Sequence, residues 1–430
     1  MFYGWYIIAA LFFATFLSIG ARQGFGVFVK TWEEDWAVST AAISFAAAIG
    51  TLVNGVSQPV FGWLTDKFGG RPVLLASFFV TGLATAGVAT ISSVLGLMVL
   101  YGFIISFSSG GIGFQTTGVI VARWFEKKRG VAMAVLVSGG SVGGLVFVPF
   151  LSYLLIEVGW QAAWIITGLI ALLIGIPLLL IVVKSKPDDI GLTIDGVDPN
   201  SEEGLHGSAD AVGPKFVDKW FDALSSRPIW QLSFGYFVCG ITTTSIGVHF
   251  VRWANSEDIT TGTAALAFGL LSGINAAGVL VVGVMSDRFQ RKNLLGGVYL
   301  VRGLAFLTLI FLPGDIALWA FAVIGGMSWL ATVPLTASLT ADVYGVRNLG
   351  MLFGLANMSH AFGGALAVFL FGWAFTNWGS YNVPFVVGAI TLLAAGVVCL
   401  SISEKTNSVR FNRISQSNEL DSGSVTAGAS

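Results

Sequence analysis

Twelve stretches of about twenty mostly apolar residues run through this chain of 430 residues, separated by short polar connections. A helix needs ~20 such residues to cross the hydrocarbon core of a bilayer. Backbone polar groups inside hydrocarbon must be bonded within their own segment, so each stretch is expected to be a helix. The sequence therefore predicts an all-α membrane protein with twelve transmembrane helices in a lipid bilayer. The expected spans are 5–29, 41–63, 72–91, 96–121, 130–155, 160–183, 229–252, 264–285, 294–312, 316–340, 350–373 and 382–402.

Composition supports this prediction and excludes several functions. Only 10% of the residues are charged and 55% are hydrophobic, whereas soluble proteins carry about 25% charged residues. The net charge of −1 gives no indication of a nucleic-acid partner. The two cysteines both lie in apolar stretches, so neither a disulfide framework nor a metal site is predicted. The sequence has no P-loop and no nucleophile–base set, so we expect neither an enzyme nor a cofactor.

The polar segments divide the chain into four regions. Residues 1–184 form the first six-helix half and residues 229–403 the second. Residues 185–228 are a central loop, and residues 404–430 are a Ser-, Asn- and Gly-rich tail that we expect to be disordered. Apolar side chains near the end of the loop share one helical face, which predicts an amphipathic helix at the membrane surface. These side chains are Phe216, Val217, Trp220, Phe221 and Leu224.

Basic residues set the expected orientation. With both termini in the cytoplasm, 18 of the 22 Lys and Arg residues lie on the cytoplasmic side. Only Lys30 and Arg252 then lie outside, and Arg22 and Arg302 lie within spans. This is the bias that membrane proteins show, so we predict cytoplasmic termini in the plasma (inner) membrane.

The two halves repeat each other. The second expected helix is followed by Gly62-x-x-x-Asp66-Lys67-Phe68-Gly69-x-Arg71, and the eighth by Gly283-x-x-x-Asp287-Arg288-Phe289-Gln290-x-Lys292. The offset is 221 residues. Four glycines of the first half recur in the second at an offset of 220, which indicates two pseudo-symmetric halves. They are Gly130, Gly143, Gly144 and Gly159, followed by Gly350, Gly363, Gly364 and Gly379.

The motif Gly62–Arg71 after the second expected helix resembles the signature loop of the major facilitator superfamily. The stretch Arg123-Trp-Phe-Glu-Lys-Lys-Arg-Gly-Val-Ala132, with the Gly139 and Gly143 that follow, is similar to monocarboxylate transporters and oxalate/formate exchangers. The resemblance implies the major facilitator fold and transport by alternating access, by a protein that functions as a monomer. It also implies that the loop residues form a cytoplasmic latch whose Asp–Arg pairs across the halves break when the inner side opens. The latch residues are Asp66, Arg71, Asp287, Lys292 and Asp342.

The chain departs from that group at one site. In monocarboxylate transporters and oxalate/formate exchangers, an Asp and an Arg on the eighth helix serve proton coupling and carboxylate binding. The corresponding positions here are Asn275 and Val279. This pair therefore does not carry over, although Asn275 remains a candidate contact for substrate.

Four ionisable residues lie inside the expected spans: Arg22, His249, Arg302 and His360. Such residues are costly in a membrane and indicate function. Deep in the spans the sequence has no Asp or Glu, so the fixed charge is positive and favours an anion.

Arg22 is the first candidate for contact with that anion. It lies among glycines on the first helix, which lines the cavity in this superfamily, and a guanidinium can donate two parallel hydrogen bonds to a carboxylate. Arg302, on the ninth helix, is an alternative contact or a packing residue bonded to helix carbonyls. The histidines could take up protons or could be neutral residues bonded between helices.

Neutral polar side chains complete the predicted site. Tyr101 and Gln115 repeat with Ser108 every seven residues on the fourth helix, and Asn54 and Gln58 are four residues apart on the second. They could line the cavity or hold helices together.

The leading hypothesis is a secondary transporter of a small organic anion, a monocarboxylate by resemblance. Proton symport, exchange and uniport all remain open. One alternative is an exporter of neutral drugs or metabolites, since a cationic drug would require a membrane-embedded acid. Another is a transporter-like receptor or sensor, which would normally carry a sizeable soluble domain.

Overall fold

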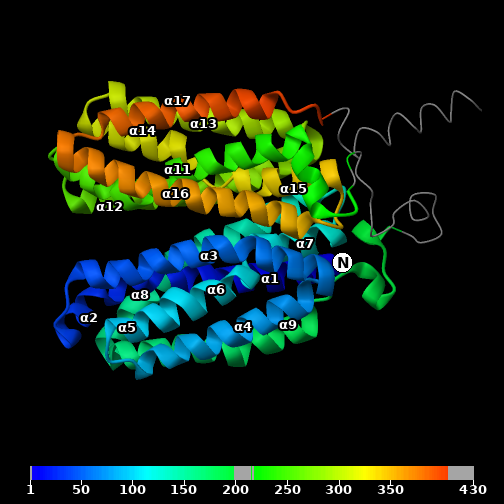
Figure 1. Cartoon of the computed structure of the whole chain (residues 1–430), viewed down its shortest axis with the longest axis horizontal. Coiled ribbons are helices and arrows are strands. Elements are labelled where there is room, and N and C mark those ends of the chain that lie inside the picture. The colour runs from blue at the N-terminus through cyan, green and yellow to red at the C-terminus, as the bar shows by residue number, and fades with distance from the viewer. Residues whose placement is uncertain (1, 198–214, 216, 405–430) are drawn as a thin grey trace, which may run out of the picture.

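A computed structural model describes residues 2–197, 215 and 217–404, and these residues are helices and connections without strands. The helices form two bundles that lie side by side, one from each half of the sequence (Figure 1). The N-terminus and the connection between the halves lie at one end of the bundles, which we call the loop end. The all-α architecture predicted from the sequence is confirmed.

The first bundle contains six passes. Their elements are α1 (Gly4–Gln23), η1 (Gly24–Phe28) and α2 (Val29–Trp36); α3 (Thr40–Phe68); α4 (Gly70–Gly87) with η2 (Val88–Thr90); α5 (Val94–Leu97), η3 (Met98–Ile105), α6 (Ser106–Ser108), η4 (Ser109–Ile112) and α7 (Phe114–Trp124); and α8 (Arg129–Ile170), η5 (Ala171–Gly175) and α9 (Ile176–Val182).

The second bundle repeats this plan with fewer interruptions. Its elements are α11 (Arg227–Ser256), α12 (Thr261–Arg288), α13 (Arg291–Phe311), α14 (Gly314–Gly326), α15 (Thr332–Tyr344), α16 (Leu349–Trp378) and α17 (Asn382–Leu400).

Ten stretches of these helices are long and apolar enough to span a membrane. One of them, Arg129–Val182, is 54 residues long and contains two passes, because Gly159 turns the chain at φ 82°, where only glycine is unstrained. The pair α14 and α15 makes one more pass, interrupted at residues 327–331. Ten stretches, one additional pass in the long stretch and one from this pair give twelve passes among the described residues.

Packing between the bundles is also pseudo-symmetric. α3 packs on α16 and α8 packs on α12, so the second and fifth passes meet the eleventh and eighth passes, respectively. Large apolar side chains such as Ile156 and Phe311 are exposed on the outer faces, as expected where lipid is the solvent.

The described residues of the connection between the halves contain three short 3₁₀ helices, η6 (Pro187–Ile190), η7 (Ile194–Gly196) and η8 (Trp220–Ser225). The predicted amphipathic helix falls partly on η8, where Phe221 and Leu224 are exposed; Phe216 lies outside the described residues. Of the predicted tail, only Glu404 is described. It is buried and accepts hydrogen bonds from the backbone N–H groups that begin α13.

Candidate functional site

The first-half candidates meet where the fourth pass is interrupted. Between Ser109 and Gly113 the chain leaves the α-helix, which frees backbone groups that need partners. Asn54 on α3 donates from Nδ2 to the Ser106 carbonyl oxygen at 3.0 Å and to Ser109 Oγ at 3.1 Å. Its Oδ1 accepts from Gln58 Nε2 at 3.0 Å. The structure thus brings Asn54 and Gln58 together, with Asn54 holding the interrupted helix.

Arg22 completes this cluster from α1. Its Nη1 donates to Asn54 Oδ1 at 3.0 Å, and its guanidinium interacts with the Tyr101 hydroxyl. The Arg22 side chain is exposed. No carboxylate pairs with it anywhere in the described part of the chain. The guanidinium therefore has no acidic partner among the described residues and has donors to offer a ligand.

Arg22 also lines a cavity in the first half that is partly open to solvent. Its polar lining comes from hydroxyl groups and the guanidinium, and its apolar lining from aromatic and aliphatic side chains. The main contributors are Ser18, Thr81, Tyr101, Ser106, Ser109 and Thr167 on the polar side, and Phe78, Ile105, Phe147 and Trp164 on the apolar side. A polar anchor beside an apolar wall is the usual form of a small-molecule site.

Close packing of α1 on α8 fixes the position of Arg22. A Cβ added at Gly20 would lie 2.8 Å from the carbonyl oxygen of Gly143, and one at Gly143 would lie 2.3 Å from that of Phe16. Both distances are too short for any side chain. The glycine-rich sequence around Arg22 therefore sets the approach of α1 to its neighbour.

Gln115 does not line this cavity, contrary to the prediction. It is fully buried, and its Nε2 donates to the Gly110 carbonyl oxygen across the interruption. Ser108 contacts Thr81. The seven-residue spacing fails because the fourth pass contains a π-helical turn, Met98–Ile105, and a 3₁₀ turn, so α-helical periodicity does not continue through it. Of the three predicted residues, Tyr101 is the one on the cavity wall.

The second half has a matching interruption in the tenth pass. Asn275 is the pseudo-symmetric counterpart of Asn54, 221 residues later. Its Oδ1 accepts from the Leu330 N–H at 2.8 Å, and its Nδ2 donates to Ser141 Oγ of the first half at 3.2 Å. Asn275 therefore holds the interruption and bridges the halves, while Val279 is fully buried.

Arg302 supplies the guanidinium on this side, from α13. It is fully buried, and its Nη2 donates to the carbonyl oxygens of Ser328 and Trp329 in the interruption. Its Nη1 donates to Cys239 Sγ at 3.1 Å. Each half thus has one arginine at its interrupted helix: Arg22 reaches an exposed position, and Arg302 is enclosed by protein.

The two histidines have different surroundings. His249 is buried, with Nε2 3.0 Å from the Val368 carbonyl oxygen and Nδ1 3.2 Å from the Tyr381 hydroxyl. A carbonyl oxygen only accepts, so Nε2 carries a hydrogen, and the ring joins α11 to α16. His360 is half-buried, and its Nε2 lies 3.2 Å from Thr243 Oγ1.

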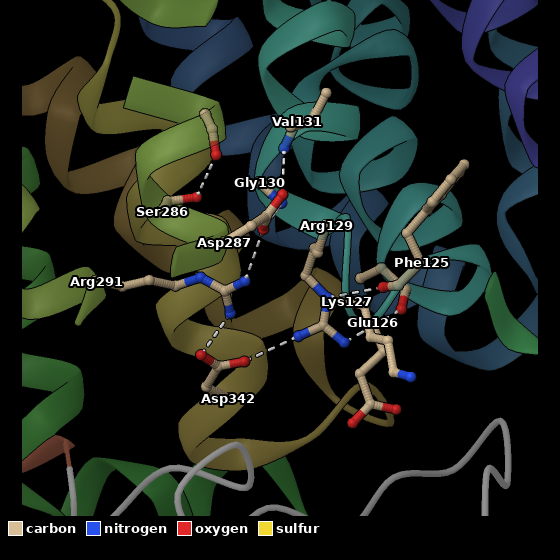
Figure 2. A network of polar contacts seen from close by, with 12 residues as sticks. Phe125, Glu126, Lys127, Arg129, Gly130, Val131, Ser286, Asp287, Arg291 and Asp342 are labelled. Carbon is tan, nitrogen blue, oxygen red and sulfur yellow. Dashed lines mark hydrogen bonds and ion pairs between the residues drawn. The ribbon is translucent and has the colours of Figure 1, made fainter. Parts of the chain in front are cut away.

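The loop end is closed by carboxylates that cap helices of the opposite half. Asp66 accepts from the N–H groups of Gly350 and Met351 at 2.9 and 2.8 Å. Asp287 accepts from those of Gly130 and Val131 at 2.7 and 3.0 Å (Figure 2). A helix N-terminus favours a negative charge. The carboxylates of Asp66 and Asp287 therefore each join the two halves through two charge-assisted hydrogen bonds.

Motif glycines make these contacts possible. A Cβ on Gly62 would lie 2.1 Å from the Gly350 carbonyl oxygen, and one on Gly350 would lie 2.5 Å from that of Gly62. A Cβ on Gly130 would lie 2.5 Å from the carbonyl oxygen of Gly283. The repeated glycines thus bring the two halves into backbone contact beside each carboxylate.

An ion-pair network adds to this closure (Figure 2). Asp342 accepts from Arg129 of the first half at 3.0 Å and from Arg291 of the second at 2.5 Å. Arg291 also reaches Asp287 at 3.4 Å. All three residues of the Asp342 pairs are buried. Neither arginine is among the predicted site residues, although Arg129 lies in the stretch that carries the resemblance.

Arg71 and Lys292 take a different position from the one predicted. Arg71 donates to the Leu180 carbonyl oxygen at 2.6 Å, and Lys292 Nζ donates to that of Leu400 at 3.2 Å. Each therefore binds the end of the sixth pass of its own half rather than an aspartate of the other half. A basic side chain is stabilised at a helix C-terminus by the same dipole.

Comparison with known proteins adds the family. The profile of the Major Facilitator Superfamily matches residues 11–367 and 232–420. The oxalate:formate antiporter of Oxalobacter formigenes is 26% identical over 402 residues, which cover 91% of this chain and 89% of that protein. Monocarboxylate transporter 13 of Bos taurus is 25% identical over 419 residues, 93% of this chain and 89% of that one. The crystal structure of the human organic anion transporter MFSD10 matches with a TM-score of 0.70 at 16% identity, covering 92% of this chain and 99% of that chain. This last likeness supports the fold alone.

Proposed function

This chain belongs to the major facilitator superfamily, and on that premise we propose that it transports a small organic anion, of the monocarboxylate class, by alternating access. The bundles would rock about a site near the middle of the membrane. The loop end, which we assign to the cytoplasm from the distribution of basic residues, would open and close in the cycle. No oligomer is required for this mechanism.

Arg22 carries the proposal. It is an exposed guanidinium on a cavity wall, with an amide oxygen and a phenol as partners. A carboxylate ligand would supply the negative charge that these partners lack, and the guanidinium would bind it through two parallel hydrogen bonds. The hydroxyl groups around the cavity would accept or donate further bonds.

The closed loop end supports alternating access. Asp66 and Asp287 bind backbone N–H groups of the opposite half, and Asp342 joins arginines of both halves. These contacts must break for the loop end to open, and they are small in number. We infer that the described structure is the state closed on this side.

The apolar part of the cavity wall supports a second candidate, the export of neutral metabolites. Phe78, Phe147 and Trp164 could bind an uncharged ligand without using Arg22. The two candidates differ in the charge of the solute that the protein exchanges.

A counterflow experiment separates them. Vesicles containing the purified protein and preloaded with unlabelled solute are exposed to the same solute with a radioactive label. We expect faster uptake of labelled formate, pyruvate or oxalate than in protein-free vesicles, and no protein-dependent uptake of neutral solutes of similar size. Exchange of neutral solutes without exchange of any carboxylate would refute the anion proposal.

A further inference from the structure

A cluster of polar side chains is buried inside the second half, where α11, α13, α15 and α16 meet. Its centre is Cys239 of α11, with 2% of its surface exposed. Arg302 Nη1 lies 3.1 Å from its Sγ, and Thr332 Oγ1 lies 3.3 Å away. The imidazole of His360 also lies beside the thiol, and its Nε2 lies 3.2 Å from Thr243 Oγ1. A cation, a hydroxyl and an imidazole therefore surround one sulfur atom.

Arg302 raises a question of charge balance. A guanidinium buried in a membrane protein is costly unless it is paired. Its other partners are the carbonyl oxygens of Ser328 and Trp329, which are dipoles without net charge. Within the described residues, no aspartate or glutamate pairs with Arg302. A group beside it that can lose a proton would supply the missing counter-charge.

The sulfur of Cys239 is the group best placed to do so. The titratable groups that face it are Arg302 and Tyr299 on α13, Tyr236 on α11 and His360 on α16. A free cysteine loses its proton at lower pH than a free tyrosine. A nearby arginine and hydrogen-bond donors stabilise a thiolate over a thiol. The geometry thus fits a thiolate–guanidinium pair.

We propose that Cys239 is a proton-binding site of this transporter, a thiolate paired with Arg302 in one state and a neutral thiol in the other. The proton enters through the half-buried His360. The imidazole takes a proton from hydronium at one ring nitrogen and gives the proton on its other nitrogen to Cys239 Sγ, which leaves the ring neutral in its other tautomer. One O–H bond and one N–H bond break, and one N–H bond and one S–H bond form. Release reverses these steps.

This proposal deepens the transport function proposed above, on which its coupling role rests. Protonation of the thiolate raises the net charge of the bundle by one, which favours binding of an anion. By reciprocity, a bound anion favours protonation. The cluster would therefore couple one proton to one monocarboxylate, at a position unrelated to Asn275 and Val279.

The chain contains its own control cysteine. Cys399 on α17 is also fully buried, beside Gly235 and Tyr299. No cation donates a hydrogen bond to it among the residues described. Replacement by serine nearly keeps the size and hydrogen bonding of either side chain and leaves a hydroxyl that does not ionise near neutral pH. Cys239→Ser therefore removes a thiol beside a guanidinium, and Cys399→Ser removes a thiol without such a neighbour among the described residues.

The first test needs no ligand. The ultraviolet absorbance of the thiolate is recorded as a difference between the parent protein and each variant, while pH is varied from acidic to mildly alkaline. We expect the parent-minus-Cys239→Ser difference to show thiolate at neutral pH and to lose it on acidification. The Cys399→Ser difference is expected to show no thiolate at neutral pH. Two identical titrations would overturn the proton site.

The second test measures coupling in vesicles with labelled pyruvate, a carboxylate that stays ionised near neutral pH. A gradient of about one pH unit is expected to give about tenfold accumulation with the parent and with Cys399→Ser. Cys239→Ser is expected to lose that accumulation and to keep pyruvate counterflow. Accumulation at the parent level in Cys239→Ser, or loss of counterflow together with accumulation, would overturn the coupling role. If the parent exchanges no anion but the thiolate titrates as expected, the proposed function fails and the proton site stands.

Discussion

Replacement of Asp66 by asparagine is expected to weaken closure of the loop end. The carboxylate accepts two hydrogen bonds, from Gly350 N and Met351 N. An amide keeps one acceptor oxygen and turns an NH₂ group toward the other N–H. Hydrogen bonds to a charged group contribute ~1.5–3 kcal/mol and neutral ones ~0.5–1.5 kcal/mol. Loss of one bond and weakening of the other cost the closed state about 3 kcal/mol, or roughly two orders of magnitude in the closed-to-open ratio.

The distance between spin labels on the two halves at the loop end measures this ratio directly. We expect Asp66→Asn to increase the population with long distances and to reduce the rate of counterflow, with the protein still folded. Asp287→Asn, its counterpart, is expected to act in the same direction. Asp188→Asn is the matched control, because Asp188 is an exposed carboxylate whose ion-pair partner among the described residues is Lys186, in its own loop. Distance distributions for Asp66→Asn that equal those of the control would refute the latch.

Three further predictions concern other parts of the molecule. Arg302→Ala leaves two buried carbonyl oxygens without a donor, at about 1–3 kcal/mol each. It is expected to lower folded yield and the thermal midpoint, measured by fluorescence-detected chromatography. Gly350→Ala places a Cβ 2.5 Å from a carbonyl oxygen and is expected to shift the same label distances toward the open state, whereas Gly297→Ala meets nothing within 4 Å and is expected to leave them unchanged. A cysteine at Asp188 is expected to react with a membrane-impermeant reagent only from the cytoplasm and one at Ser256 only from outside; labelling of both from one side would contradict the topology.

The fold could be predicted because two of its determinants can be read directly from the sequence. Length and hydropathy define the spans, and the 221-residue offset pairs the halves. The same offset relates Asp66 to Asp287 and Asn54 to Asn275, which occupy equivalent places in the structure. In this architecture the repeat offset therefore predicts which residues of the two halves occupy equivalent positions.

Contacts between distant segments could not be predicted in the same way. Arg129 and Arg291 meet Asp342 only because the two halves pack together, and no spacing rule connects them. Arg71 and Lys292 were expected to face aspartates, but each reaches a helix end of its own half instead. A basic residue near a repeat has several partners within reach, and packing selects among them.

The interrupted helices explain the remaining differences. Periodicity assumes a continuous α-helix, and the fourth pass contains π and 3₁₀ turns that change the direction of later side chains. Gln115 is therefore turned into the protein, where it binds Gly110. Glycines and serines near residues 109–113 indicate a weak point in the helix, but their pattern does not specify its geometry.

Equilibrium binding of a carboxylate to purified, folded variants at Arg22 tests the central claim most directly. The ligand is the labelled carboxylate that the parent exchanges fastest. Arg22→Ala removes the positive charge and the two parallel N–H donors of the guanidinium. It is expected to weaken binding by one to two orders of magnitude, since a hydrogen bond to a charged group contributes ~1.5–3 kcal/mol. Arg22→Lys keeps the charge without the bidentate geometry and is expected to retain part of the affinity. Normal binding by Arg22→Ala, together with loss of binding by folded Arg302→Ala, would contradict the account and place the anion at the ninth helix.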